Sequence, residues 1–274
     1  MNPNRKSAIV TGAYGAIGQA ICEGIAERGF EVTLVGRDPS SLEKTRVKLI
    51  QHTANDRIFG EAVDLSSQTE IFEFSRRWHR PLHLLVNNAA TAPRKRTESA
   101  EGMEIQWAVN VLGYFRMIHY FHPFMEGISN ARIVNVASYW AGGMELNDPE
   151  FKRRSYDNDV AYRQAKQADR MLSVAFAERL KSKGISVNSC HPGDVNSKLS
   201  NAFGFGGSES PAQGASTPLL LALSESMKEV TGKYFEHRKE VRCPFSSDTE
   251  AVEKLYQLCE KSTPVYPINS QSAF

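Results

Sequence analysis

The segment Ser7-Ala-Ile-Val-Thr-Gly-Ala-Tyr-Gly-Ala-Ile-Gly18 decides the fold of this chain. Its first four residues form a largely apolar run that ends at a Thr-Gly pair, which predicts a buried strand entering a tight turn. Apolar residues follow at every fourth position from Ile17 to Ile25, and Gly29 stands where a helix of this length would end. A strand, a glycine-rich turn and a helix in succession indicate the start of a βαβ unit.

The same alternation continues along most of the chain. Further strands are expected at residues 31–35, 58–63, 82–86, 132–137 and 185–190, with an edge strand around 233–235. Helices are expected at about residues 40–52, 68–77 and 101–125, and in a segment that ends near residue 183. This pattern predicts an α/β fold: a single Rossmann-type domain over residues 1–274, with a doubly wound parallel sheet of about seven strands.

Ligands of such sheets bind beyond the carboxyl ends of the strands. Residues 139–158 and 198–217 each follow an expected strand, and the second stretch is rich in Gly and Ser. We therefore expect both stretches to be substrate loops of the site.

The composition argues against several classes of function. Of 274 residues, 33 are Lys or Arg and 31 are Asp or Glu, so the net charge of +2 gives no reason to expect a nucleic-acid partner. No apolar run reaches the roughly 18 residues needed to span a bilayer. Four scattered cysteines favour a reducing, cytoplasmic location. His119 and His122 have no third ligand placed beside them, so no metal site is expected.

Tyr162 and Lys166 lie four residues apart in a segment of helical pattern, so both side chains can point into the same space. A free tyrosine has a pKa near ~10, and a nearby cation lowers this pKa toward the range useful for acid–base catalysis. Taken alone, a surface helix with an unrelated Tyr and Lys explains the pattern better. A functional interpretation depends on the residues around the pair.

The glycine-rich turn and this pair together resemble the TGxxxGxG and YxxxK motifs of the short-chain dehydrogenase/reductase family, and the resemblance extends from Lys6 to about Phe235. It implies a Rossmann fold that binds a nicotinamide cofactor. Ala16 stands where the family has a glycine, and we expect its methyl group to weaken cofactor binding without abolishing it. The turn residues expected at the cofactor are Gly12, Tyr14, Gly15, Ala16, Ile17 and Gly18.

The end of the second expected strand distinguishes NAD from NADP. Relatives that use NAD place an acidic residue there to bond the ribose hydroxyls, whereas this chain has Gly36 followed by Arg37. A guanidinium can grip a 2′-phosphate with two hydrogen bonds, so NADP(H) is the expected cofactor, although the acidic Asp38 lies close by. By resemblance, the adenosine half is expected to contact Asp64, Leu65, Asn88 and Ala89.

The resemblance also assigns a catalytic tetrad in the right order along the chain: Asn110, Ser138, Tyr162 and Lys166. Tyr162 is the expected acid or base, and Ser138 is expected to orient the substrate carbonyl. Lys166 is expected to lower the pKa of Tyr162 and to bond the nicotinamide ribose, while Asn110 holds a water that links Lys166 to solvent. The nicotinamide is expected to contact Pro192, Gly193, Val195 and Ser197, as well as Tyr162 and Lys166.

These expectations describe an NADP(H)-dependent carbonyl reductase or alcohol dehydrogenase. Ser138 and Tyr162 are separated by a longer insertion than is usual in the family, as in its retinol dehydrogenase-like branch. The insertion carries apolar and aromatic residues, which favour a hydrophobic aldehyde, ketone or alcohol as the substrate unless they simply cover the core. These residues are Trp140, Met144, Leu146 and Phe151. A homo-oligomer is compatible with the sequence.

The alternative is a non-catalytic NADPH-binding sensor or regulatory protein on the same fold. Its support is the replacement of two family glycines by Ala16 and Ala90. The complete tetrad argues against this alternative.

Overall fold

The computed structural model describes residues 5–263 and contains one eight-stranded sheet in the order β3-β2-β1-β4-β5-β6-β7-β8. Strands β1 to β7 are parallel, and β8 is antiparallel to β7. The strands are β1 (Ser7–Thr11), β2 (Glu31–Gly36), β3 (Ile58–Ala62), β4 (Leu84–Asn87), β5 (Ala131–Val136), β6 (Ile185–Cys190), β7 (Tyr234–Glu236) and β8 (Lys239–Val241). The strand order reverses between β1 and β4, which confirms the predicted single doubly wound domain.

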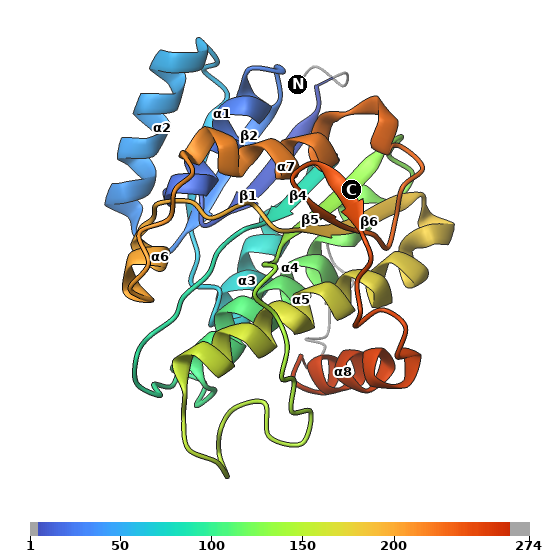
Figure 1. Cartoon of the computed structure of the whole chain (residues 1–274). Coiled ribbons are helices and arrows are strands. Elements are labelled where there is room, and N and C mark those ends of the chain that lie inside the picture. Colours follow the sequence, from blue (N-terminus) through green and yellow to red (C-terminus); the bar gives the residue numbers. More distant parts are fainter. Residues whose placement is uncertain (1–4, 264–274) are drawn as a thin grey trace.

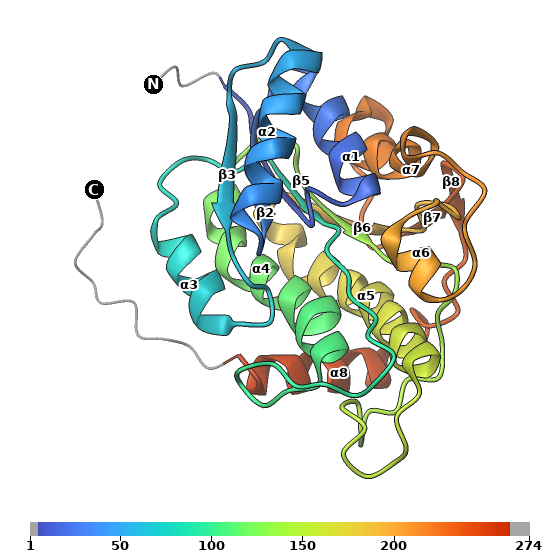
Figure 2. The same ribbon diagram turned by 90° about the vertical axis from the view of Figure 1, so that its left-hand side faces the viewer.

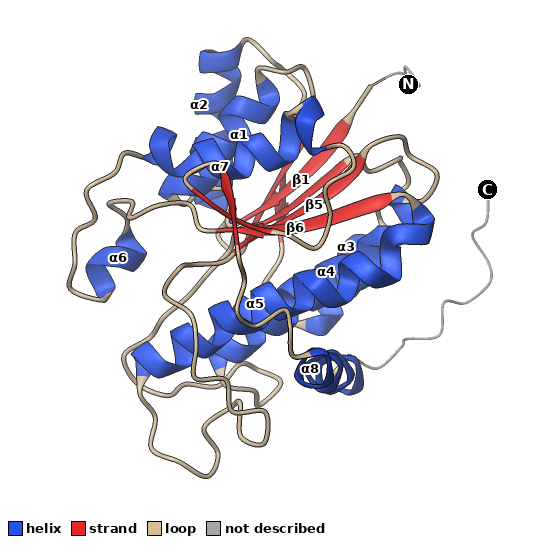
Figure 3. Cartoon of the chain, turned by 45° about the vertical axis from the view of Figure 1, so that its right-hand side comes forward, coloured by secondary structure: helices blue, strands red, loops and turns tan. Residues whose placement is uncertain are grey.

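Helices cover both faces of the sheet (Figures 1 and 3). One apolar core lies between the sheet and α1, α2 and α7, and the other lies between the sheet and α3, α4, α5 and α8. The α-helices are α1 (Ala16–Ala26), α2 (Pro39–Thr53), α3 (Gln68–Arg76), α4 (Gly113–Phe121), α5 (Asn158–Leu180), α6 (Lys198–Ala202), α7 (Pro211–Leu223) and α8 (Thr249–Lys261). Shorter helical pieces are η1 (Trp107–Leu112), η2 (His122–Met125), η3 (Lys181–Lys183) and η4 (Glu225–Met227).

The eighth strand is a correction to the predicted count of about seven. It follows β7 through a two-residue turn in which His237 and Arg238 have φ values of 45° and 64°. Such a turn normally carries glycine or asparagine, because few other residues adopt positive φ readily. The sequence therefore holds no turn signal between β7 and β8.

The expected single helix over residues 101–125 is also corrected. Glu98 and Glu104 pair across a turn instead, and the helical run begins with the π-helical η1 before α4. The buried carboxylate of Glu104 accepts hydrogen bonds from the backbone N–H groups of Gln106 (3.0 Å) and Trp107 (2.7 Å). An acidic side chain that satisfies the first free N–H groups sets where this helix starts.

The stretch 198–217, expected to be a loop, contains α6 and the first half of α7. A capping box begins α7, because Ser210 accepts from the N–H of Gln213 and Gln213 accepts from the N–H of Ser210. Pro211 stands at the first helical position, where its missing N–H costs nothing. The sequence Ser-Pro-Ala-Gln carried this start signal.

Arg132 links the centre of the sheet to the end of α7. Its buried guanidinium donates from Nη1 to the carbonyl oxygens of Leu221 (3.0 Å) and Ser224 (2.7 Å), and from Nε to Asn130 (2.8 Å). These carbonyls lie at the C-terminal end of α7, where the helix itself supplies no donors. The contact holds α7 against the sheet.

We predict that Arg132→Leu lowers the free energy of unfolding by about 2–4 kcal/mol, because buried carbonyls lose their donor. Equilibrium unfolding in urea measures this change. The exposed Arg76 on α3 gives a matched control, and Arg76→Leu should change the free energy by less than about 0.5 kcal/mol. Equal effects of the two substitutions would contradict the role given to Arg132.

Candidate active site

The glycine-rich turn after β1 is held by the end of β4. Thr11 Oγ1 accepts from the backbone N–H groups of Asn88 (2.9 Å) and Ala89 (3.1 Å), and Asn88 Nδ2 donates to the carbonyl of Thr11 (3.0 Å). A Cβ on Gly12, whose φ is 63°, would lie 2.7 Å from Ala89 Cα, and one on Gly18 would lie 2.2 Å from the carbonyl oxygen of Gly12. Glycine is required at both positions.

The start of α1 has the features of an anion site. Gly15 is its N-cap residue, no side chain caps the first turn, and no acidic residue lies in that turn. Ala16 is the first residue of the helix, and the two positions that cannot hold a Cβ, Gly12 and Gly18, keep their glycines. Uncapped N–H groups beside the β1 and β4 strand ends fit the pyrophosphate of a dinucleotide.

The end of β2 is shaped by Tyr14. A Cβ added to Gly36 would lie 2.4 Å from the Tyr14 ring, so a larger side chain there would require the ring to move. Asp38 is occupied as the N-cap of α2, where it accepts from the N–H groups of Ser40 (3.3 Å) and Ser41 (3.2 Å). The hydrogen bond from the Ser41 hydroxyl, with these backbone bonds, lowers the pKa of Asp38.

Arg37, between these two positions, is exposed. The end of β2 therefore presents a guanidinium to solvent, while the neighbouring carboxylate serves the helix. This charge pattern suits an anionic group better than a pair of ribose hydroxyls.

Asp64 and Leu65 are more constrained than the sequence suggests. Asp64 Oδ1 accepts from the N–H (2.9 Å) and hydroxyl (2.8 Å) of Ser66, and its own N–H donates to Glu70 (2.8 Å). The Leu65 side chain is buried in the core beside Gly113. Any contact with an adenine would use backbone groups or the second Asp64 oxygen.

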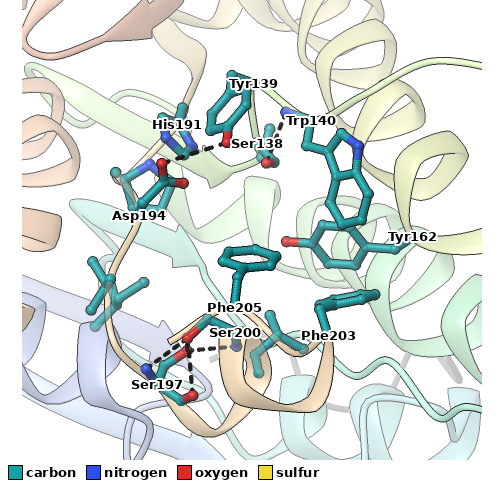
Figure 4. A pocket seen from close by; sticks show the side chains of 16 residues that line it. Ser138, Tyr139, Trp140, Tyr162, His191, Asp194, Ser197, Ser200, Phe203 and Phe205 are labelled. Carbon is teal, nitrogen blue, oxygen red and sulfur yellow. Dashed lines mark hydrogen bonds between the residues drawn. The ribbon is translucent and has the colours of Figure 1, made fainter. Parts of the chain in front are cut away.

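Tyr162 and Ser138 face a common pocket at the carboxyl end of β5 (Figure 4). Tyr162 lies in the second turn of α5, which begins at the N-cap Asp157. Its ring, 8% exposed, packs against Trp140 (6.0 Å between centroids) and Phe203 (4.9 Å). Burial raises the pKa of Tyr162, while Lys166 and a hydrogen bond with Ser138 act against this rise.

Lys166 lies beside Tyr162 as the four-residue spacing predicts, with its ammonium 5.8 Å from the Tyr162 ring centroid. Nζ donates to the carbonyl of Val136 (3.0 Å) and to Asp169 Oδ2 (2.9 Å). Asp169 was not predicted as part of the site. Its position three residues after Lys166 on the same helix was the available signal.

Asn110 is buried in the π-helical piece η1. Its side-chain amide pairs with the backbone of Thr91, accepting from the N–H (2.9 Å) and donating to the carbonyl (2.9 Å). This pairing ties η1 to the segment after β4. The predicted role of Asn110, holding a water next to Lys166, stays a prediction.

The pocket beside Tyr162 has a mainly apolar lining drawn from several segments. The stretch 139–158 contributes Tyr139 and Trp140, and the segment from α6 onward contributes Leu199, Phe203 and Phe205. Other lining residues, from the first turn of α1 and the segment after β6, are Ile17, Pro192, Gly193, Val195 and Ser197. Tyr139, Leu199, Phe203 and Phe205 were not among the predicted site residues.

The rest of the insertion lies elsewhere. Met144 and Leu146 pack against the core, and Phe151 packs edge-on against Tyr156. The loop that carries them projects beyond the start of α5 (Figure 2). For these three residues the simpler explanation, that they cover other parts of the protein, holds.

Ser197 caps the short helix α6 as well as lining the pocket. Its hydroxyl accepts from the N–H of Ser200 (3.1 Å), and Ser200 Oγ accepts from the N–H of Ser197 (2.9 Å). Gly193 has a φ of 102°, which only glycine adopts readily. The segment after β6 is thus held in a fixed course past the pocket.

The chain belongs to the short-chain dehydrogenase family, whose model matches residues 6–204. It is 35% identical over 263 residues to a probable oxidoreductase of Streptomyces antibioticus, covering 88% of each chain. It is 30% identical to mouse retinol dehydrogenase 13, covering 92% of this chain and 81% of the relative. The predicted family and its retinol dehydrogenase-like character are confirmed.

Solved structures agree on the fold. A protein from Mycobacterium paratuberculosis superposes with a TM-score of 0.80 at 22% identity, covering 95% of both chains. L-Sorbose reductase from Gluconobacter frateurii, complexed with NADPH and L-sorbose, superposes with a TM-score of 0.68 at 23% identity, covering 84% of this chain and 94% of that one.

Two further features concern the described residues as a whole. Within residues 5–263, no helix is both long and apolar enough to cross a membrane. Across the same range, no group of three His, Cys, Asp or Glu side chains is arranged to hold a metal ion.

His191 is a buried histidine at the edge of the pocket, 4% exposed, with its ring 4.5 Å from the Tyr139 ring centroid. Burial lowers its pKa to about 4. The folded protein therefore keeps this ring neutral, whereas the unfolded chain protonates it below pH ~6.5. His191 therefore does not change the free energy of unfolding above that pH, and it lowers this free energy as the pH drops from there toward 4.

We predict that the free energy of unfolding of the wild type falls by up to about 3 kcal/mol between pH 7 and pH 4 through this residue alone. His191→Phe removes that contribution, so the difference between wild type and variant should change with pH. His52→Phe, at an exposed position on α2, is the control. A difference between wild type and His191→Phe that stays constant from pH 7 to pH 5 would contradict the prediction.

Proposed function

We propose that this protein is an NADP(H)-dependent oxidoreductase that reduces a hydrophobic aldehyde or ketone, or oxidises the matching alcohol. The observation that carries the proposal is the convergence of the Tyr162 phenol and Ser138 on one largely apolar pocket (Figure 4). This pocket also reaches Ile17, in the first turn of α1, whose N-terminus fits a dinucleotide. Membership of an oxidoreductase family supports the same chemistry.

Each tetrad residue has a defined task in this mechanism. The nicotinamide, when bound, supplies or accepts the hydride at the substrate carbon. Tyr162 donates its proton to the carbonyl oxygen during reduction and accepts it during oxidation, while the Ser138 hydroxyl orients that oxygen. Lys166 favours the phenolate form of Tyr162 and holds the ribose next to the ring. Asn110 supports the water that returns a proton to the site.

The choice of NADP(H) over NAD(H) rests on the end of β2 and on Tyr14, which packs against it. Tyr14 occupies the space above Gly36, where an acidic side chain would read the ribose hydroxyls. Asp38 caps α2, so its carboxylate is engaged with the helix N-terminus and is compatible with a phosphate bound at Arg37. The exposed Arg37 remains to bind the 2′-phosphate of NADP(H).

The remaining expected contacts fall on three parts of the dinucleotide: the pyrophosphate, the adenosine half and the nicotinamide. The turn residues Gly12, Tyr14, Gly15, Ala16, Ile17 and Gly18 would hold the pyrophosphate. Asp64, Leu65, Asn88 and Ala89 would lie along the adenosine half, and Pro192, Gly193, Val195 and Ser197 along the nicotinamide. Thr11 was not among the predicted site residues. Its hydroxyl accepts from the backbone N–H groups of Asn88 and Ala89 and would position them along the adenosine half.

The substrate class follows from the pocket lining. Trp140, Phe203 and Phe205 place aromatic surface around the Tyr162 hydroxyl, and such surface binds apolar groups. Relatives named retinol dehydrogenase are consistent with a hydrophobic carbonyl or alcohol. The four cysteines of the chain are free thiols, which fits a cytoplasmic enzyme that uses NADPH for reduction.

We predict that Tyr162→Phe lowers kcat/KM for NADPH-dependent reduction by about 10²–10⁴-fold, because the proton donor is lost. Loss of NADPH absorbance with a panel of aromatic and aliphatic aldehydes and ketones measures the rate. Tyr256→Phe, on α8, should react like the wild type. If no member of the panel reacts faster with wild type than with Tyr162→Phe, the chain is the non-catalytic NADPH-binding protein instead.

We predict that Arg37→Ala weakens NADPH binding by about 10–100-fold, because charge-assisted hydrogen bonds to the 2′-phosphate are lost. NADH binding should change less than about threefold. Titration of each dinucleotide into the protein measures both constants, with the exposed Arg76→Ala as control. Equal losses for NADPH and NADH would show that Arg37 does not read the 2′-phosphate.

A further inference from the structure

A buried ion pair lies directly behind the Tyr162 phenol. Lys166 Nζ and Asp169 Oδ2 are 2.9 Å apart, and the two side chains are 2% and 0% exposed. Both residues lie on α5, three positions apart. The mechanism described above uses Lys166 but gives no task to the carboxylate.

Two phenols and two thiols are among the described groups that face the pair. Facing Lys166 are Tyr162 from α5, the Tyr114 ring from α4 at 5.1 Å, and the buried thiol of Cys190 from β6. Cys259 of α8 faces Asp169, and burial raises the pKa of its thiol so that it stays neutral. Among residues 5–263, Asp169 is thus the one carboxylate paired with Lys166.

The ionisation states follow from this arrangement. Burial disfavours the charged lysine, but Asp169 and the two phenols outweigh it and raise the pKa of Lys166. Burial raises the pKa of Asp169 to about 6 against the effect of Lys166, which leaves the carboxylate ionised at neutral pH. The pair therefore carries no net charge at neutral pH.

A buried pair of this kind is weak evidence for stability, because removing two charges from water offsets most of their attraction. The two charges of the pair also act on the protonation of Tyr162, in opposite directions. The Lys166 cation favours the phenolate, and the Asp169 anion close behind it favours the neutral phenol. The carboxylate also holds the ammonium against the Val136 carbonyl of β5.

We propose that Asp169 is a positioning residue: it holds the Lys166 ammonium in place and offsets part of its charge, so that Tyr162 loses its proton only at a higher pH than it would beside an unpaired lysine. This inference rests on the proposed function, because a protonated Tyr162 is the form that donates to a carbonyl oxygen. The site is therefore set for reduction. Alcohol oxidation, which needs the phenolate, would require a more alkaline medium.

Asp169→Asn tests the proposal, since the amide keeps the shape and one acceptor oxygen while removing the charge. The readout is the phenolate titration of Tyr162, followed by ¹³C NMR of ring-labelled tyrosine and assigned with Tyr162→Phe. The titration midpoint should fall by about one to two pH units relative to wild type. Glu178→Gln, at an exposed carboxylate on the same helix, should leave the midpoint unchanged.

A second comparison covers the case in which Asp169→Asn does not fold. Lys166→Met leaves Asp169 unopposed, and the double variant Lys166→Met/Asp169→Asn buries no charge at all. The Tyr162 midpoint should be at least about one pH unit lower in the double variant than in Lys166→Met. Equal midpoints within both pairs of proteins would overturn the proposal.

Activity gives an independent measurement. The limb on which the rate of alcohol oxidation rises with pH should move to lower pH in Asp169→Asn by the same interval as the titration, and Asp169→Glu, which keeps the charge, should show the wild-type profile. The NMR titration needs no substrate. If wild type reduces no carbonyl, the proposed function fails while the titration still decides the role of Asp169.

Discussion

A line of buried hydrogen bonds fixes α5, the helix that carries Tyr162 and Lys166, to the centre of the sheet, and the site depends on it. Asn87 of β4 donates to Asn135 of β5 (2.9 Å), Asn135 donates to Ser173 of α5 (2.8 Å), and Ser173 donates to the carbonyl of Asp169 (2.7 Å). All four residues are buried. Polar groups in such a place must stay paired, so α5 has one rotation and one height against the sheet.

That position of α5 determines what meets at the strand ends. Tyr162 lies beside Ser138 at the end of β5, and Lys166 is held against the Val136 carbonyl of the same strand. The neighbouring ends of β1 and β4 carry the glycine-rich turn, tied together by Thr11 and Asn88. The glycine-rich turn and Ser138 thus lie at the ends of rigid strands and Tyr162 lies on a helix fixed to them, while the aromatic lining comes from the connecting segments that follow β5 and β6.

Much of this arrangement was predictable from the sequence, because local patterns specify it. The strand–turn–helix at Ser7–Ile25, the parallel strands and the Tyr162–Lys166 spacing are all local signals, and the sheet and the shared pocket follow from them. What the sequence did not reveal depends on tertiary packing. That Tyr14 fills the space above Gly36 becomes evident only when the elements meet. The capping of α2 by Asp38 is local instead, and the Asp38-Pro39 pair carried its signal in the sequence.

The sequence also did not predict that Lys166 and Asp169 form a buried ion pair. A lysine followed by an acid three residues later is common on exposed helices, and burial of Lys166 and Asp169 depends on α4, β5 and α8 packing around them. Similarly, the β7–β8 turn uses His237 and Arg238 without a glycine, and Met144 and Leu146 of the insertion turned out to face the core. Apolar composition alone does not say which surface a loop residue covers.

The central claim is that hydride and proton are exchanged at one site beside Tyr162. NADPH carrying deuterium at one or the other C4 position of the nicotinamide, incubated with the enzyme and a reactive hydrophobic aldehyde, tests it most directly. Mass spectrometry of the alcohol should find deuterium on the carbinol carbon from only one of the two labelled forms, because the fixed strand ends present one face of the ring. Alcohol without deuterium, or equal transfer from both forms, would contradict the account.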